Sequence, residues 1–411
     1  MADPEAAAAA PDRAGRARLI AALVAGQLGL HASMAGLRMA ASLQALHEGA
    51  SPWTVGVLLA LFAAAPVAMS LHSGRMADRH GYHRPVRIAA ALTLVGLLLA
   101  LGACAVEGPP HFLLLCAAAA ASGTGANMGM LTIQRTAGVL ARDGPERMRV
   151  FSWLGIAPSL ANVIGPVAVG FMIDAQGFAA GYALLLALPL TSLLAARFVP
   201  PVAPRAGTVG PPRSTWDLLA VRPLRRLLAV NWLLSMCWDV HLFAVPVLGH
   251  ERGFAAATVG LILGTFTLSV TGVRLLIPLL AHRLREVPVV VAAMVGTAAV
   301  FAAYPLAPHA WVMAGLAALL GIALGSVQPM VMSMLHQLTP DARHGEALAL
   351  RSMAIHASST LMPLLFGALG AAVGAGVLFW MVGGLVGAGS WIARRLPTSA
   401  GGTRSSSSSP S

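Results

Sequence analysis

Long apolar segments separated by short polar ones make up most of this chain of 411 residues. A helix needs roughly 20 predominantly apolar residues to cross a bilayer, and all its backbone groups must be satisfied within the segment. Twelve segments meet that length, at residues 19–46, 53–73, 88–106, 112–135, 151–173, 179–198, 227–248, 258–280, 287–306, 311–335, 351–373 and 377–393. The pattern predicts an all-α membrane protein with twelve transmembrane helices.

The composition indicates a lipid environment. The chain is 57% hydrophobic and only 10% charged, with a mean hydropathy of +0.76, whereas soluble domains carry roughly 25% charged residues. So few polar side chains cannot cover that much apolar surface in water. The three cysteines lie in apolar segments, which excludes a disulfide framework and a cysteine metal site of known spacing. We expect no metal and no cofactor.

The arginines are distributed according to the side of the membrane. All 27 basic residues are Arg, and with a cytoplasmic N-terminus 24 of them fall in cytoplasmic segments. Arg252 lies in an external loop, whereas Arg38 and Arg274 lie inside spans. Positive charge in short cytoplasmic loops sets the orientation of membrane proteins, so we expect a multi-pass protein of the cytoplasmic (inner) membrane with both termini cytoplasmic. Charges spread in this way exclude a nucleic-acid-binding face, despite a net charge of +12.

A Pro- and Arg-rich stretch divides the chain into two sets of six spans. We expect a short interfacial helix at 216–219 within this stretch. The predicted organisation is a cytoplasmic tail at 1–18, a six-helix bundle at 19–198, a cytoplasmic linker at 199–226, a second six-helix bundle at 227–395 and a disordered tail at 396–411.

An internal repeat relates the two halves. Thr54-Val55-Gly56 recurs 204 residues later as Thr258-Val259-Gly260. Parallel repeats of six spans are an established plan for transporters, with the substrate site between the halves near the middle of the bilayer. At an offset of 197 the matched pairs are Pro166 with Pro363 and Gly170 with Gly367.

The segment after the second span carries a recognisable motif, Gly74-Arg-Met-Ala-Asp78-Arg79-His-Gly81-Tyr-His-Arg84. It resembles the signature G-x-L-A-D-R-x-G-R-R, which the major facilitator superfamily has at the same place between spans 2 and 3. The resemblance implies two pseudosymmetric six-helix bundles and a conformational latch. In that latch Asp78 docks near the start of the eleventh span, where a helix N-terminus favours an anion. Arg135 is a candidate ion-pair partner, and the expected latch residues are Gly74, Asp78, Arg79, Gly81, Arg84 and Arg135.

The fifth span offers a second resemblance. Gly165, Pro166 and Gly170 match the core of the superfamily's antiporter motif, which implies export by exchange. The alternative interpretation is ordinary tight helix packing at small residues. A third motif departs from the family, because exporters of this type often carry Arg four residues before G-x-G-A, and here Ala119 occupies that position. A standard proton-coupling element is therefore in doubt.

Polar side chains inside the spans are the candidates for the transport path, since they are costly there without a function. In the first span they recur at helical spacing on one face, and the equivalent seventh span repeats the pattern. The candidates for the substrate and proton pathway are Gln27, His31, Arg38, Asn127, Asn231, Asp239 and His356.

Asp239 is the carboxylate that we place in the middle of a span. Desolvation raises the proton affinity of a carboxylate, and a nearby Arg lowers it. A residue held between these effects can load and release a proton, so we hypothesise that Asp239 couples proton movement to transport, opposed by Arg38. The alternative is a static ion pair.

These features favour a secondary active transporter that works by alternating access, namely a proton-coupled antiporter that exports a small organic compound. The alternatives are an importer or facilitator of an organic anion, favoured by the arginines and histidines, and more remotely a transport-inactive receptor or scaffold. The sequence has no HExxH, G-x-S-x-G or Walker motif, which argues against an enzyme and an ATP-driven pump. We expect a monomer whose partners are the substrate, protons and lipid.

Overall fold

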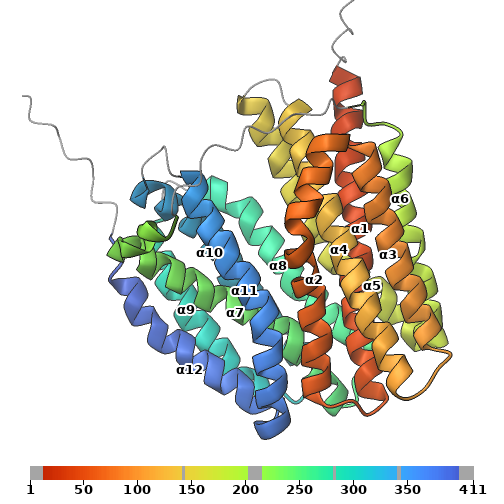
Figure 1. Ribbon diagram of the computed structural model, residues 1–411. Coiled ribbons are helices and arrows are strands. Elements are labelled where there is room, and N and C mark those ends of the chain that lie inside the picture. Colours follow the sequence, from red (N-terminus) through yellow and green to blue (C-terminus); the bar gives the residue numbers. More distant parts are fainter. Residues whose placement is uncertain (1–12, 141–143, 202–214, 281–283, 340–343, 398–411) are drawn as a thin grey trace, which may run out of the picture.

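A computed structural model describes residues 13–140, 144–201, 215–280, 284–339 and 344–397. The described residues outside the connecting turns are helical (Figure 1). The α-helices are α1 (Arg13–His47), α2 (Pro52–His80), α3 (His83–Ala103), α4 (Pro109–Leu140), α5 (Gly144–Leu185), α6 (Ala187–Ala196), α7 (Arg222–Glu251), α8 (Ala256–Leu280), α9 (Glu286–Ala303), α10 (Ala310–Leu338), α11 (His344–Val373) and α12 (Ala375–Arg394). Two short 3₁₀ helices are η1 (Thr215–Ala220) and η2 (Tyr304–Leu306).

The predicted spans are present. Among the described residues, eleven helical stretches are long and apolar enough to cross a membrane. One of them, Trp153–Ala196, is 44 residues long and contains the fifth and sixth predicted spans, which are joined at a sharp bend at Gly177. The predicted all-α fold with two bundles is confirmed. η1 lies where the sequence predicts a short interfacial helix. Of the predicted tails at 1–18 and 396–411, residues 1–12 and 398–411 lie outside the described residues, and α1 begins at Arg13, within the predicted N-terminal tail.

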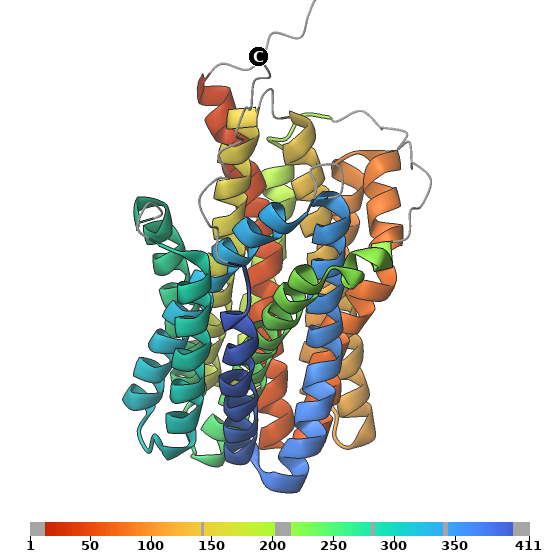
Figure 2. The same ribbon diagram turned by 90° about the vertical axis from the view of Figure 1, so that its left-hand side faces the viewer.

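The two halves lie side by side in Figure 1, α1–α6 in one and α7–α12 in the other, and Figure 2 views them from the side of the second half. α1 begins at the top of both views, the end at which α2 and α6 finish and α9 begins. That end carries Arg79, Arg197 and Arg285, and is termed the basic face. The other end, where the turn at Gly49 lies, is termed the opposite face.

The internal repeat is visible in the backbone of the turns at the opposite face. Gly49 and Gly253, 204 residues apart, have φ angles of 81° and 69°. Gly177 and Gly374, 197 residues apart, both have a φ of 85°. A residue with a Cβ rarely adopts such angles, so each pair of glycines permits the same tight turn in both halves.

The repeated motifs also make the contact between the halves. Gly56 on α2 packs against the carbonyl of Pro363 on α11, and a Cβ there would lie 3.0 Å from Gly367 Cα. In the symmetry-related place, Gly260 on α8 packs against Pro166 on α5, where a Cβ would lie 3.3 Å from Val167 Cα. Small residues let helix backbones approach this closely. The halves are therefore joined near the opposite face by two backbone seams, α2 with α11 and α5 with α8.

The two seams differ at the helix N-termini. α2 is capped by its own Ser51, whose Oγ accepts from Thr54 N at 3.3 Å. α8 has Ala255 at the matching position, and its first N–H groups donate to a residue of the other half. Asp174 of α5 accepts from Ala256 N at 2.8 Å and from Ala257 N at 2.7 Å. A carboxylate at a helix N-terminus satisfies free N–H groups and complements the helix dipole.

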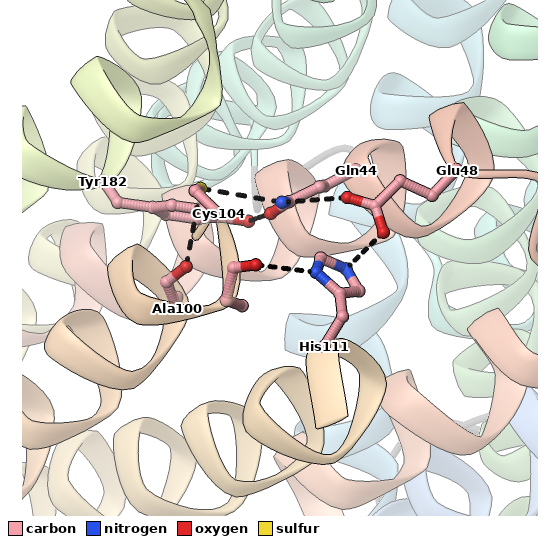
Figure 3. A network of polar contacts seen from close by, with 7 residues as sticks. Gln44, Glu48, Ala100, Cys104, His111 and Tyr182 are labelled. Atoms are coloured by element: carbon pink, nitrogen blue, oxygen red, sulfur yellow. Dashed lines mark hydrogen bonds and ion pairs between the residues drawn. The ribbon is translucent and has the colours of Figure 1, made fainter. Parts of the chain in front are cut away.

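A polar network fixes the first half at the opposite face (Figure 3). Tyr182 Oη donates to Gln44 Oε1 at 2.7 Å, and Gln44 Nε2 donates to Glu48 Oε1 at 3.2 Å. His111 Nε2 lies 2.9 Å from Glu48 Oε2, while its Nδ1 contacts the carbonyl of Ala103 at 2.9 Å. The network thus links α1 and α4 to the end of α3 and to the part of α5 beyond Gly177.

We expect Asp174→Ala to weaken closure at the opposite face. Loss of a helix cap costs about 1 kcal/mol, which corresponds to roughly a fivefold shift between conformations. The measurement is the distribution of distances between spin labels at Val106 and Leu306, one exposed residue in each half at this face. Longer distances should gain population. The control is Glu107→Gln, an exposed carboxylate of the same face, and an unchanged distribution in Asp174→Ala would contradict the prediction.

Candidate functional site

Two cavities lie in the interior between the halves. The first, termed the Arg274 cavity, has a volume of about 370 Å³ and is lined by α5, α7, α8, α10 and α11. The second, termed the His31 cavity, has a volume of about 320 Å³ and is lined by α1, α2, α4, α7 and α11. α7 runs from the basic face, and the residues that it gives to the first cavity begin at Asn231, whereas those that it gives to the second extend to Phe243. The Arg274 cavity is therefore nearer the basic face.

Asp239 belongs to both cavities, together with Ile355 and Ser359 of α11. Its carboxylate accepts from Ser358 Oγ at 2.8 Å and from Ser359 Oγ at 3.2 Å. The Ser358 hydroxyl is fully buried. A carboxylate in this position connects α7 to α11 and faces both cavities, so a change in its charge acts on both.

Arg38 lines the His31 cavity together with Asp239. Its hydrogen bond, however, goes to α5: Nη2 donates to Asn162 Oδ1 at 3.3 Å. Asn162 in turn donates to the carbonyl of Pro158 at 2.8 Å. Arg38 and Asp239 thus face a common cavity while each is held by neutral groups, an arrangement that a movement of α1 against α7 can change.

Two arginines, Arg274 and Arg351, line the Arg274 cavity. Arg274 Nη2 donates to Gln328 Oε1 at 2.6 Å, and Arg351 Nε donates to Asn231 Oδ1 at 3.2 Å. Both acceptors are neutral amides. Within the described part of the chain, Arg274 Nε and Asn231 Nδ2 are buried without a hydrogen-bond partner. These two atoms have no accessible surface, so what the cavity presents is the positive charge of its two arginines.

The other predicted pathway residues are placed as follows. His31, Asn127 and His356 line the His31 cavity. Asn127 Nδ2 donates to Ser70 Oγ at 3.4 Å, and His31 Nδ1 is buried without a partner among the described residues. Gln27 is buried, but it is not among the residues that line the two cavities. Six of the seven candidates thus line one or both of the two cavities.

The predicted packing residues lie at helix contacts. Gly165 packs against α1, where a Cβ would come within 2.8 Å of Gly36 N, and Gly170 packs against α8, 2.9 Å from Ala257 Cα. Pro166 supplies the carbonyl that Gly260 contacts. The exchange function predicted for this motif stays a prediction.

The predicted latch lies at the basic face. Gly81 ends α2 with a φ of 65°, as a tight turn requires. Arg79 and Arg84 are exposed, and a Cβ on Gly74 would meet open space. The side chain of Asp78 lies outside the described residues, so its predicted docking on the eleventh span and its pairing with Arg135 remain predictions.

Arg274 and Arg351 are not among the pathway residues predicted from the sequence, although Arg274 was placed inside a span. α11 begins at His344, two turns before the predicted start, so Arg351 lies inside the helix and faces the cavity. Ser358 was missed as well, because a single hydroxyl in a span carries no pattern of its own.

Comparison with known proteins identifies the fold and family. A family model described as the Major Facilitator Superfamily matches residues 19–228 and 227–410. A probable actinorhodin transporter of Streptomyces coelicolor is 28% identical over 245 residues, which is 57% of this chain and 35% of that protein. The chain thus spans about a third of that relative's length.

Solved transporter structures share the fold. A bacterial homologue of the human lysosomal transporter Spinster, inward-facing and occupied, has a TM-score of 0.73 at 12% identity, covering 94% of this chain and 98% of its own. A POT family transporter in complex with a thioalcohol-conjugated peptide has a TM-score of 0.72 at 12% identity, covering 91% and 94%. A bacterial homologue of the iron transporter ferroportin in an inward-facing state has 0.69 at 16%, covering 92% and 98%.

We expect Ser358→Ala to lower the free energy of unfolding by about 1–3 kcal/mol, because it removes a buried hydrogen bond to a carboxylate. In an Asp239→Asn background the same substitution should cost less, because a hydrogen bond to a neutral amide is weaker. The measurement is the midpoint of thermal unfolding in detergent of the wild type, Ser358→Ala, Asp239→Asn and the double variant. Ser352→Ala, on an exposed turn of the same helix, is the control, and equal costs in both backgrounds would contradict the prediction.

Proposed function

The chain belongs to the Major Facilitator Superfamily, and from this premise we propose that it is a proton-coupled antiporter that exports a small organic compound by alternating access. The superfamily consists of transporters and not of enzymes, so a multi-pass membrane protein that moves a small molecule is the established part. Proton coupling, the direction of transport and the monomeric state belong to the proposal.

Asp239 is the observation on which the proposal rests. It faces both cavities from the middle of α7 and is held by two hydroxyls of α11. A carboxylate can lose its charge by taking a proton, and Arg38 of the other half faces the same cavity. In the proposed cycle, the ionised form attracts Arg38 across the cavity, and the protonated form releases it. The position of one half relative to the other then depends on whether Asp239 is protonated.

The conformation supports alternating access. The seams at Gly56 and Gly260 join the halves near the opposite face. Cavity residues away from the seams, such as Gln328 of the Arg274 cavity and His356 of the His31 cavity, are exposed. We propose that the basic face is cytoplasmic, because arginines gather there, and hence that the cavities are accessible from the cytoplasm.

A second candidate is a facilitator or importer of an organic anion. It is favoured by the two arginines of the Arg274 cavity, which are held by neutral amides. The two candidates differ in whether protons move with the substrate. The resemblance of Gly165, Pro166 and Gly170 to the antiporter motif favours the first.

We expect Asp239→Asn to abolish substrate-dependent proton flux while leaving folded protein, because an amide cannot exchange a proton at this place. The protein would be reconstituted in liposomes with a trapped pH dye, and lipophilic cations, organic acids and sugars would be screened under an imposed pH gradient. Glu251→Gln, an exposed carboxylate at the end of α7, should behave like the wild type. Persistent proton-driven uptake in Asp239→Asn would overturn the coupling role, and substrate movement without proton flux in the wild type would favour the facilitator.

Orientation can be tested on a native cysteine. Cys104 is exposed at the opposite face, whereas Cys237 is buried. Desolvation raises the pKa of the Cys104 thiol, and the thiolate is the reactive form. In intact cells a membrane-impermeant maleimide should therefore label Cys104 slowly at neutral pH and faster as the pH rises, and Cys104→Ser should remove that labelling. Labelling that requires broken cells would reverse the proposed orientation.

A further inference from the structure

We propose that the Arg274 cavity binds an organic anion, a carboxylate or similar planar oxyanion carried on an apolar ring, through the guanidinium groups of Arg274 and Arg351. The inference rests on the proposed function, because it names the class of substrate that the transporter carries. It does not depend on whether protons are coupled to transport or on the direction of transport.

The charge of the cavity is the first argument. Guanidinium groups stay protonated in proteins, and two of them line a cavity of about 370 Å³. Their hydrogen bonds go to Gln328 and Asn231, which carry no charge. The carboxylate that lines the same cavity, Asp239, accepts from Ser358 and Ser359. Two positive charges thus face one negative charge whose oxygens are already hydrogen-bonded to α11.

The donor capacity of the two guanidinium groups is the second argument. Each group has five N–H donors, and the hydrogen bonds to Gln328 and Asn231 use Nη2 of Arg274 and Nε of Arg351. A charged acceptor is the best partner for a guanidinium. An oxyanion between the two arginines would supply acceptors to the forks of both. A neutral ligand would leave both charges unpaired, and a cation would be repelled.

The apolar wall defines the rest of the ligand. Leu234, Leu324 and Val327 line the cavity together with Trp238. Trp238 is held edge-on against Phe266, with ring centroids 4.6 Å apart, so its position is fixed by packing. A flat apolar ring fits against such a surface, with its oxyanion toward the arginines. The volume is at the low end of the range for small-molecule sites, which suits a compound of one or two rings.

Binding of three probes with the same ring system and different charge tests the inference. We would titrate the purified full-length protein in detergent with 2-naphthoate, 2-naphthamide and 2-naphthylmethylammonium by calorimetry. We expect naphthoate to bind at least about tenfold more tightly than the amide, and the ammonium to bind most weakly. Equal or tighter binding of the amide or the ammonium would overturn the inference, as would failure of naphthoate to bind at millimolar concentration.

Variants locate the site. Arg351→Gln and Arg274→Gln should each weaken naphthoate binding by about tenfold to a hundredfold, the loss of a charged hydrogen bond, and should leave amide binding unchanged. Arg87→Gln, an exposed arginine of α3, is the matched control. Unchanged naphthoate binding in both cavity variants would overturn the inference. If either variant fails to fold, Arg351→Lys, which keeps the positive charge, would be measured in its place. The comparison of the three probes with the wild-type protein would then decide whether the cavity prefers an anion.

Counterflow of labelled probes in liposomes separates this inference from the proposed function. Naphthoate that binds through the arginines without being transported would leave the anion site standing and remove the transport proposal for this compound class. Transport of the ammonium in preference to naphthoate would remove the anion site and leave the transport proposal in place.

Discussion

Backbone-to-backbone contact at glycines holds the two halves together, and the rest of the architecture depends on it. Gly56 and Gly260 allow α2 and α8 to touch the carbonyls of Pro363 and Pro166 in the opposite half. Such seams have no long side chains to rearrange, so the halves can tilt against each other while each bundle keeps its packing. Because both seams are near one face, the space for the polar cavities remains toward the other.

The interior combines few charges with many neutral hydrogen-bonding groups. Amides and hydroxyls hold Asp239, Arg38, Arg274 and Arg351, and among these four residues no carboxylate accepts a hydrogen bond from a guanidinium. In a low-dielectric interior a permanent ion pair would be hard to break. Holding the charges on neutral partners leaves them available for a proton or a ligand that comes and goes.

The sequence predicted the spans and the repeat well, because both rest on long apolar runs and on glycine turns whose physics is local. It also placed His31, Arg38 and Asp239 on the cavity, since helical spacing fixes which face they share. It missed Arg351 and Asp174, because their roles depend on helices that continue past the apolar segment. α11 begins two turns earlier than hydropathy predicts, and α5 runs on to Gly177, which places Asp174 beside α8.

Each half is specialised as the partner of the other. Asp174 of the first half caps α8 of the second, whereas the equivalent position on α11 is Ala371 and α2 is capped by its own Ser51. Two copies of the second half, assembled in the same way, would leave the first turn of α8 with unsatisfied N–H groups. The two halves are therefore not interchangeable at this contact, because α8 takes its cap from the other half whereas α2 supplies its own.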